Sequence, residues 1–224
     1  QHQTLLELAS DPQQEQLKRI QAEAVAHEAQ LKMLRYQLNP HFLFNTLNAI
    51  SALVKVKETN KAFDMIIQLS KFLRYSLDND PVHKVSLRQE IEATRQYLNI
   101  ERTRFGSRLK LHFDVPSHCE IIDVPSLILQ PLVENAIKYA IAPSESGGQV
   151  SILALIDDSY LVIRVIDTGP GINGAKIPIK SAGIGLRNTD ERLKQFYSDD
   201  YHLQLDNTSD GGLCVTLKLP FEHI

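Results

Sequence analysis

An apolar repeat near the N-terminus constrains this chain more than any other feature. Apolar residues recur there at alternating intervals of three and four residues, so they form a narrow stripe along one side of a helix. Such a stripe marks the seam of a coiled coil or a helical bundle. A lone helix that carries it gains little by folding alone, so we expect association with a second copy of the chain. Residues 1–30 are expected to form a coiled-coil lead-in helix. The seam positions are Leu17, Ile20, Ala24, His27, Leu31, Leu34, Leu38 and His41.

Pro40 should interrupt this helix directly before His41, because proline removes a backbone donor and clashes with the preceding turn. The apolar pattern then resumes, and a short polar segment separates two amphipathic stretches. Two such helices per chain, paired across a dimer, make a four-helix bundle. Residues 31–82 are therefore expected to form a helical hairpin, with Phe42 and Phe44 in the bundle core.

The rest of the chain, residues 83–224, indicates a different architecture. Ser86 and Gln89 form a capping box ahead of one helix, and Pro125 is expected to open another. Short β-rich runs lie between and after these helices. The pattern predicts an α+β protein whose second part is an α/β sandwich, with one mixed sheet and helices on one face. The expected strands cover residues 109–115, 149–156, 161–166, 201–205 and 213–219.

Composition and charge exclude several classes of protein. The chain has 224 residues, 43% hydrophobic and 23% charged, which suits a globular protein of two units. A net charge of -3 offers no basic face, so we expect no direct nucleic acid binding. Cys119 and Cys214 show no metal spacing, and no apolar run reaches the length of a membrane span. Because the chain begins with Gln1, we expect a cytoplasmic fragment whose upstream membrane sensor domain is absent.

Three short segments in the second half point to nucleotide chemistry. Residues 134–138 lie on an expected helix, residues 167–171 follow a strand, and residues 183–186 open a helix. An aspartate at a strand end can accept a hydrogen bond from an adenine amino group, and glycines beside it let the backbone approach a ligand. Glycines at a helix start present N–H groups to phosphates, and an asparagine oxygen suits Mg²⁺. In this order, the three segments favour nucleotide binding.

These segments resemble the N, G1 and G2 boxes of the GHKL (Bergerat-fold) ATP-binding domains. Residues 34–48, with Asn-Pro-His-Phe-Leu-Phe-Asn at positions 39–45, resemble the phosphoacceptor segment of the LytS/YehU-type sensor histidine kinases. The resemblance runs from about residue 31 to residue 220. It includes residues 97–101, 104–105 and 130–135.

The resemblance implies a protein-histidine kinase, the cytoplasmic core of a sensor histidine kinase in a two-component system. His41 would be phosphorylated with ATP and would then pass the phosphoryl group to an aspartate of a response regulator, often of the LytTR type in this family. Residues 83–224 would form the GHKL-type ATP-binding catalytic domain. The kinase would act as a homodimer, and the full-length protein would reside in the bacterial inner membrane.

The resemblance also gives each matching residue a role. Asn135 would ligate Mg²⁺, and Asp167 would bind the adenine amino group. Glu134 could act as a base or orient a water, a choice that the resemblance leaves open. By analogy with other kinase families, Asn45, one helical turn beyond His41, would position a water for dephosphorylation. The other candidate ATP-binding residues are Lys138 facing the phosphates, Gly169 and Gly171 in the pocket floor, and Gly183, Gly185 and Leu186 at the lid end.

Several positions depart from the family pattern and leave alternatives open. Phe42 stands where many sensor kinases carry an acid, so the general base is unassigned. Tyr139 and Ala140 replace an expected histidine and glycine, and Leu213 replaces a threonine that would contact adenine. Two other functions therefore stay open: a GHKL ATPase whose helices only dimerise, and a signalling scaffold that has lost nucleotide binding.

Single residues also have plainer interpretations. Taken alone, His41 could be a buried core histidine. Glu134 and Lys138 could form an ordinary exposed helix pair. Arg102, Arg104 and Arg108 are expected on a solvated face, with phosphate contact as the alternative.

Overall fold

The computed structural model describes residues 16, 39–79, 82–172 and 183–221, which belong to two compact units, residues 1–45 and 46–224. Most of the expected lead-in helix and its seam, and most of the lid segment after Gly171, lie outside the described residues. Within those ranges, no helix combines the length and the apolar character that crossing a bilayer requires.

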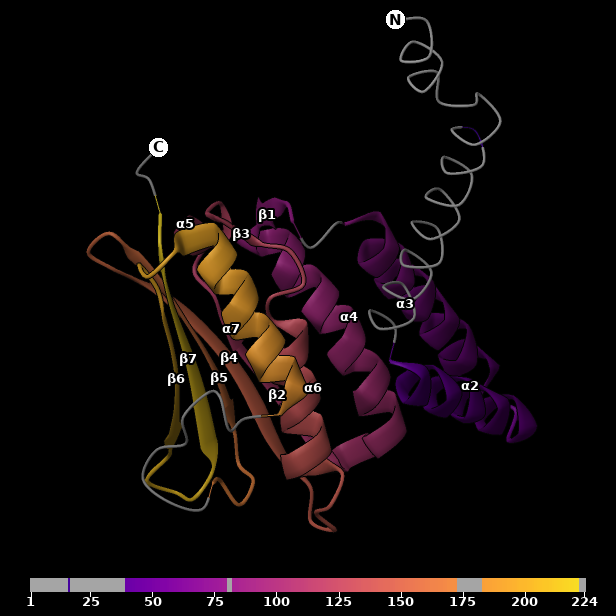
Figure 1. Ribbon diagram of the computed structural model, residues 1–224. Helices are drawn as coiled ribbons and strands as arrows, with labels where there is room; N and C mark the ends of the chain where they lie inside the picture. The colour runs from indigo at the N-terminus through magenta and orange to yellow at the C-terminus, as the bar shows by residue number, and fades with distance from the viewer. Residues whose placement is uncertain (1–15, 17–38, 80–81, 173–182, 222–224) are drawn as a thin grey trace, which may run out of the picture. The chain divides into compact units, whose positions relative to one another are not determined.

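The expected helical hairpin is present as α2 (Pro40–Lys55) and α3 (Thr59–Asp78), shown in Figure 1. Pro40 is the first residue of α2, a position where the missing N–H costs nothing. Asn39 caps this start, because its Oδ1 accepts a hydrogen bond from the Phe42 N–H at 3.3 Å. The proline kink itself falls where the structure gives no description of the preceding chain.

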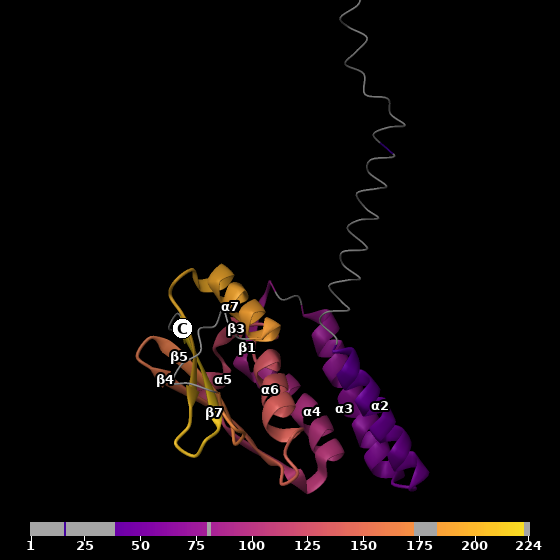
Figure 2. The same ribbon diagram turned by 60° about the horizontal axis from the view of Figure 1, so that its bottom comes forward.

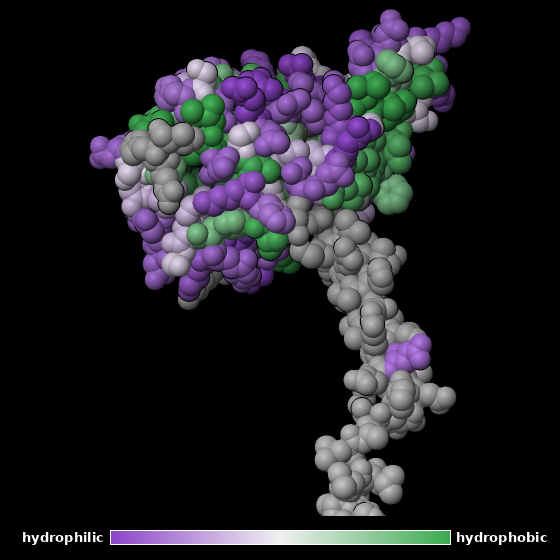
Figure 3. Space-filling model, turned by 90° about the horizontal axis from the view of Figure 1, so that it is seen from above, coloured by the Kyte–Doolittle hydropathy of each residue, from purple (hydrophilic) through white to green (hydrophobic). Residues whose placement is uncertain are grey.

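The hairpin divides its apolar residues between two faces. The inner face of α3 is buried at helical spacing, and α3 packs against α4 (Leu87–Phe105). Phe42 is also buried, as expected, whereas Phe44 is 68% exposed in the single chain. Figure 3 shows hydrophobic atoms gathered at the right of the view, where the hairpin lies. The exposed large apolar side chains of the hairpin include Leu47, Val54, Val56, Phe63, Ile66, Ile67 and Leu77.

Helix α4 confirms the predicted capping box. The Ser86 side chain accepts the Gln89 N–H, and the Gln89 side chain accepts the Ser86 N–H at 3.1 Å. The helix ends at Gly106, whose φ of 62° suits a residue without a Cβ. A short 3₁₀ turn, η1 (Gly106–Arg108), leads into the sheet.

The predicted mixed sheet is confirmed, with strand order β2-β4-β5-β7-β6. The β2–β4 pair is parallel and the other pairs are antiparallel. Figures 1 and 2 show α4, α6 (Gln130–Ala136) and α7 (Ile184–Tyr197) on one face of this sheet. Side chains of that face and of the helices form the core, among them Val150, Ile152, Ile163, Leu217, Leu132 and Leu193. The bounds are β2 (Leu109–Asp114), β4 (Gly148–Asp157), β5 (Tyr160–Asp167), β6 (His202–Asn207), β7 (Leu213–Pro220) and α7 (Ile184–Tyr197).

The prediction that Pro125 opens a helix is wrong. Pro125 ends β3 (Asp123–Pro125), which pairs with β1 (Lys84–Ser86) in a small second sheet. Helix α6 begins only at Gln130 (Gln130–Ala136), because Leu127 has a φ of 58° that no right-handed helix accommodates. A π-helical turn, η2 (Ile137–Ile141), then extends α6, and a short helix, α5 (Ser117–Glu120), precedes β3.

Candidate functional site

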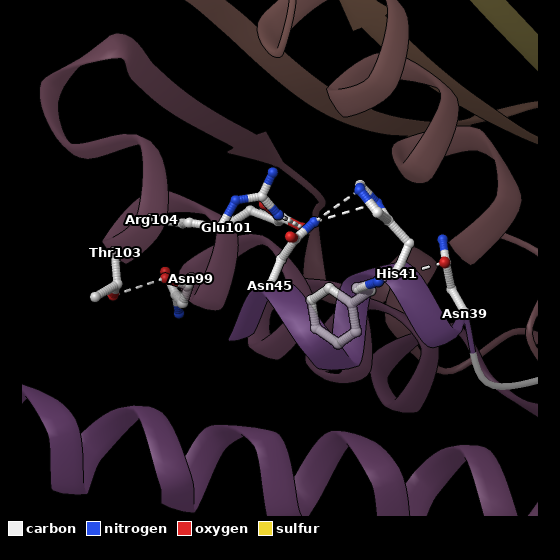
Figure 4. A network of polar contacts seen from close by, with 8 residues as sticks. Asn39, His41, Asn45, Asn99, Glu101, Thr103 and Arg104 are labelled. Atoms are coloured by element: carbon white, nitrogen blue, oxygen red, sulfur yellow. Dashed lines mark hydrogen bonds and ion pairs between the residues drawn. The ribbon is translucent and has the colours of Figure 1, made fainter. Parts of the chain in front are cut away.

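His41 and Asn45 lie one above the other on the first turns of α2 (Figure 4). The Asn45 Nδ2 lies 3.2 Å from His41 Nδ1 and 3.2 Å from His41 Nε2, as residues four apart on a helix can. The His41 side chain is exposed and Asn45 is half-buried. His41 is therefore not a buried core histidine, and its imidazole is accessible to a reactant in this chain.

Asp167, at the end of β5, is the buried acid that the sequence predicted at a strand end. Its Oδ1 accepts hydrogen bonds from the Gly169 N–H at 2.9 Å and the Leu213 N–H at 3.3 Å. Burial raises the pKa of this carboxyl, and the two backbone N–H groups act against that rise. Among the described residues, no hydrogen bond engages Oδ2. One oxygen thus fixes the loop while the other can accept a ligand N–H group.

Close backbone approaches explain three glycines around Asp167. A Cβ on Gly169 would lie 2.5 Å from the Cβ of Ala140, so the loop packs directly on η2. A Cβ on Gly212, the residue before β7, would lie 1.8 Å from the Asp167 carbonyl oxygen. Gly171 has a φ of 68°, which favours glycine. The Ala140 and Leu213 departures are thereby accommodated: Ala140 packs against a residue without a side chain, and Leu213 contributes its backbone N–H.

Asn207, on β6, holds the far end of this loop. Its Oδ1 accepts the Ile172 N–H at 2.7 Å, and its Nδ2 donates to the Ile172 carbonyl at 2.8 Å. Sequence reasoning missed Asn207 because nothing in its local pattern marks it. It also missed Gly212, whose need for a glycine comes from a strand more than forty residues away.

The N-box residues lie on α6, which packs against both β5 and α7. Asn135 is half-buried, and within the described ranges no hydrogen bond or ion pair engages its side chain. A neutral amide oxygen in that state fits Mg²⁺, which keeps several waters and takes few protein ligands. Glu134 accepts a hydrogen bond from Gln130 Nε2 at 2.8 Å. The exposed Lys138 ammonium lies 4.8 Å from the centre of the Tyr139 ring.

The G2 glycines open α7 as predicted. Gly183 is the residue before the helix, and its carbonyl accepts the Arg187 N–H at 3.2 Å. A Cβ on Gly185 would lie 3.6 Å from Pro131, an ordinary contact, and one on Gly183 would meet nothing within 4 Å. Leu186 is buried. Packing therefore does not require either glycine, and their role beside the phosphates stays a prediction.

A buried acid that the sequence did not single out as a functional residue, Glu101 on α4, lies near the N box. Arg104 Nη1 lies 2.8 Å from Glu101 Oε2, a pair drawn in Figure 4. Burial raises the pKa of Glu101 to about 7; Arg104 lowers it, and the neighbouring Glu134 charge raises it. Arg108 donates to the Ser144 carbonyl at 3.1 Å. Arg102 is exposed, as predicted, whereas Arg104 and Arg108 are half-buried, so the prediction of a solvated arginine face is wrong for those two.

Comparison with known proteins agrees with this arrangement. Residues 29–109 match the histidine kinase family, and residues 122–223 match the histidine kinase-, DNA gyrase B- and HSP90-like ATPases. The sensor histidine kinase BtsS of Escherichia coli K12 is 35% identical over 199 residues, which cover 88% of this chain and 34% of BtsS. The chain belongs to the sensor histidine kinase family. Within that family, the sensor histidine kinase/phosphatase LytS of Staphylococcus aureus Mu50 is 33% identical over 209 residues, or 88% of this chain and 35% of LytS.

The solved structures show that this sensor histidine kinase chain shares its fold with kinase catalytic domains. The catalytic domain of the histidine kinase ThkA superposes with a TM-score of 0.50 at 17% identity, covering 62% of this chain and 95% of that domain. The chain spans about a third of the length of the curated relatives it matches.

Proposed function

We propose that this chain is the kinase core of a two-component system and that it transfers the γ-phosphoryl group of ATP to His41. The observation that carries the proposal is the exposed His41 imidazole with the Asn45 amide 3.2 Å from its ring nitrogens. The accompanying domain belongs to an ATPase class, and Asp167, whose Oδ1 accepts the Gly169 N–H, would accept a hydrogen bond from an adenine amino group at its other oxygen.

The chemistry requires little covalent assistance from the protein. A lone pair on a ring nitrogen of neutral His41 attacks the γ-phosphorus, the bond to the β,γ-bridging oxygen breaks, and ADP leaves. The ring proton departs to a base that the sequence leaves unassigned. Asn135 would hold Mg²⁺, which when bound neutralises phosphate charge. Lys138, Gly183 and Gly185 would line the phosphate side, and Gly169 and Gly171 would shape the adenine side.

Asn45 gives the site a second role. Its amide lies beside the imidazole, where it can orient a water toward the phosphoryl group of a docked regulator. A relative in Staphylococcus aureus that bears the name sensor histidine kinase/phosphatase supports this role. We expect Asn45→Ala to retain phosphorylation of His41 and to lose dephosphorylation of a regulator that the wild type labels.

The surroundings of the kinase core follow from its surface and its chemistry. The exposed apolar residues of α2 and α3 would be covered by a second copy in a four-helix bundle. A response regulator, of the LytTR type, would receive the phosphoryl group. Use of cellular ATP places this segment in the cytoplasm, next to a membrane sensor domain of the whole protein. Residues 1–30, 31–82 and 83–224 would serve as lead-in helix, phosphoacceptor hairpin and ATP-binding domain.

Labelling with γ-³²P-ATP and Mg²⁺ tests the proposal. Wild type should acquire acid-labile, alkali-stable label, and His41→Gln should acquire none. His112→Gln, which alters an exposed histidine on β2, is the matched control and should label like wild type. Undiminished label on His41→Gln would exclude the assignment. ATP hydrolysis without any phosphoenzyme would instead establish the GHKL ATPase alternative.

A further inference from the structure

Glu90, in the first turn of α4, is a buried acid that the proposed chemistry does not use. Its exposed fraction is 2%. Its carboxylate accepts backbone N–H groups from Leu127 at 2.6 Å, Ile128 at 3.0 Å and Leu129 at 3.2 Å. The Tyr75 hydroxyl of α3 donates to the same carboxylate. Four donors on one buried carboxylate exceed what the capping of a single helix requires, so Glu90 connects several elements.

The segment that Glu90 holds is strained. Leu127 adopts a φ of 58°, a left-handed conformation that is costly for a bulky side chain and persists only where its surroundings impose it. Arg192 of α7 supplies the other half of the restraint, because its Nη1 donates to the Ser126 carbonyl at 2.8 Å and the Leu127 carbonyl at 3.1 Å. Residues 126–129 are thus clamped from both sides immediately before α6 begins.

The clamp joins the hairpin to both helices that carry nucleotide motifs. Tyr75 comes from α3, the clamped loop leads into α6 with Asn135, and Arg192 belongs to the helix that follows the G2 glycines. Burial raises the pKa of Glu90, and its hydrogen bonds act against that rise, so removing a donor weakens the charged form that binds the loop.

We propose that Tyr75 and Glu90 are positioning residues for nucleotide binding, through which the packing of α3 sets the placement of the N-box helix. The Tyr75 hydroxyl keeps Glu90 turned onto the 126–129 loop, and the loop fixes where α6 presents Asn135. Because coupling between sites is reciprocal, bound Mg-ATP would in turn favour the packed position of α3. The inference rests on the proposed function, since it concerns how that function's nucleotide is held.

Tyr75→Phe tests the coupling with little change in packing, because it removes one oxygen next to a cavity of about 10 Å³, no larger than a water molecule. Tyr160→Phe is the matched control: it also removes a tyrosine-to-carboxylate hydrogen bond, from Tyr160 at the start of β5 to the exposed Asp200 at 2.6 Å, which involves no residue of the clamp. Calorimetry with Mg²⁺ and a non-hydrolysable ATP analogue, together with thermal unfolding, compares the two variants.

We expect Tyr75→Phe to weaken nucleotide binding about fivefold or more, as loss of a hydrogen bond to a charged group does, and Tyr160→Phe to change it less than about twofold. At saturating ATP, His41 of Tyr75→Phe should label at the wild-type rate, which separates positioning from catalysis. Glu90→Gln should weaken nucleotide binding further, since its amide NH₂ group would face the backbone N–H donors of residues 127–129. If Glu90→Gln does not fold, the Tyr75→Phe result alone tests the inference.

A wild-type dissociation constant for Tyr75→Phe overturns this inference and leaves the kinase proposal intact. A lower melting temperature with unchanged affinity also overturns it, because it assigns Tyr75 a purely structural role. If wild type itself binds no nucleotide, the proposed function fails, and the inference falls with it.

Discussion

The α2–α3 hairpin and the sheet domain treat their apolar residues in opposite ways. The hairpin exposes Leu47, Phe63 and Ile66 at 55%, 61% and 48%. The sheet domain buries the covered face of its central strands, with Ile152, Ile163 and Leu217 at 0%. The exposed apolar side chains of the hairpin remain in contact with water, which is unfavourable unless a partner buries them. The core of the sheet domain, in contrast, is buried within one chain.

This contrast predicts that the stability of the hairpin depends on protein concentration and that the stability of the sheet domain does not. In the proposed dimer the hairpin would be stabilised by mass action, so its stability should rise with protein concentration. The sheet domain should unfold at the same denaturant concentration whether the chain is dilute or concentrated. Each prediction below changes one region and leaves the other as an internal reference.

The largest effect is expected inside the sheet domain, from Gly212→Ala. The new Cβ would meet the Asp167 backbone, which cannot move without breaking the β5–β7 pairing, so we expect a loss of about 4 kcal/mol of unfolding free energy. Urea unfolding followed by circular dichroism measures it. Gly183→Ala, where a Cβ meets no atom within 4 Å, should cost no more than about 1 kcal/mol, the preference of a helix N-cap for glycine over alanine. Equal stability of the two variants would refute the steric argument.

The hairpin should respond to Phe63→Ser with a weaker dimer. Loss of an apolar contact from both copies should cost about 3 kcal/mol, or roughly a hundredfold in dimer dissociation constant. Analytical ultracentrifugation measures that constant. Ile121→Ser alters a side chain that is 56% exposed on the sheet domain and should leave dimerisation unchanged. If both variants dimerise like wild type, the exposed face of the hairpin is not the interface.

Glu101 should make the stability of the sheet domain depend on pH. Its folded pKa of about 7 lies above the 4.5 of an ordinary glutamate. As the pH rises above 4.5, the Glu101 carboxyl ionises in the unfolded chain but stays protonated in the folded chain. The unfolding free energy therefore falls with rising pH, and the fall levels off above about pH 7. Between pH 5 and pH 8 we expect a loss of about 2 kcal/mol that Glu101→Gln abolishes.

Urea unfolding at the two pH values measures this loss, with the exposed Glu92→Gln as control. A Glu101→Gln variant that keeps the wild-type pH dependence would show that other groups cause it.

The smallest effect should come from Ser86→Ala, which removes the capping box of α4. Loss of this cap should cost about 1 kcal/mol. Ser159→Ala, on the exposed turn between β4 and β5, should change the unfolding free energy less than about 0.5 kcal/mol. A larger loss from Ser159→Ala than from Ser86→Ala would contradict the assignment of the cap.

Features carried by adjacent residues were predictable. The capping box at Ser86, the end of α4 at Gly106 and the shared face of His41 and Asn45 each depend on positions no more than four apart. The strand pattern also predicted the mixed sheet. The error at Pro125 has the opposite cause, since the 126–129 loop takes its shape from Glu90, 37 residues from Leu127.

The order of the elements, the segment around His41 that we propose as the phosphoacceptor and the three motifs of the ATP-binding domain could all be recognised from the sequence. Helical and strand periodicity and cap chemistry act within a few residues, so they can be read along the chain. Which acids are buried, why position 212 requires glycine and how α3 contacts the loop before α6 become visible only in the folded chain. Those properties arise from groups far apart in sequence, and a charge or a Cβ acquires its energy only from the neighbours that the fold brings to it.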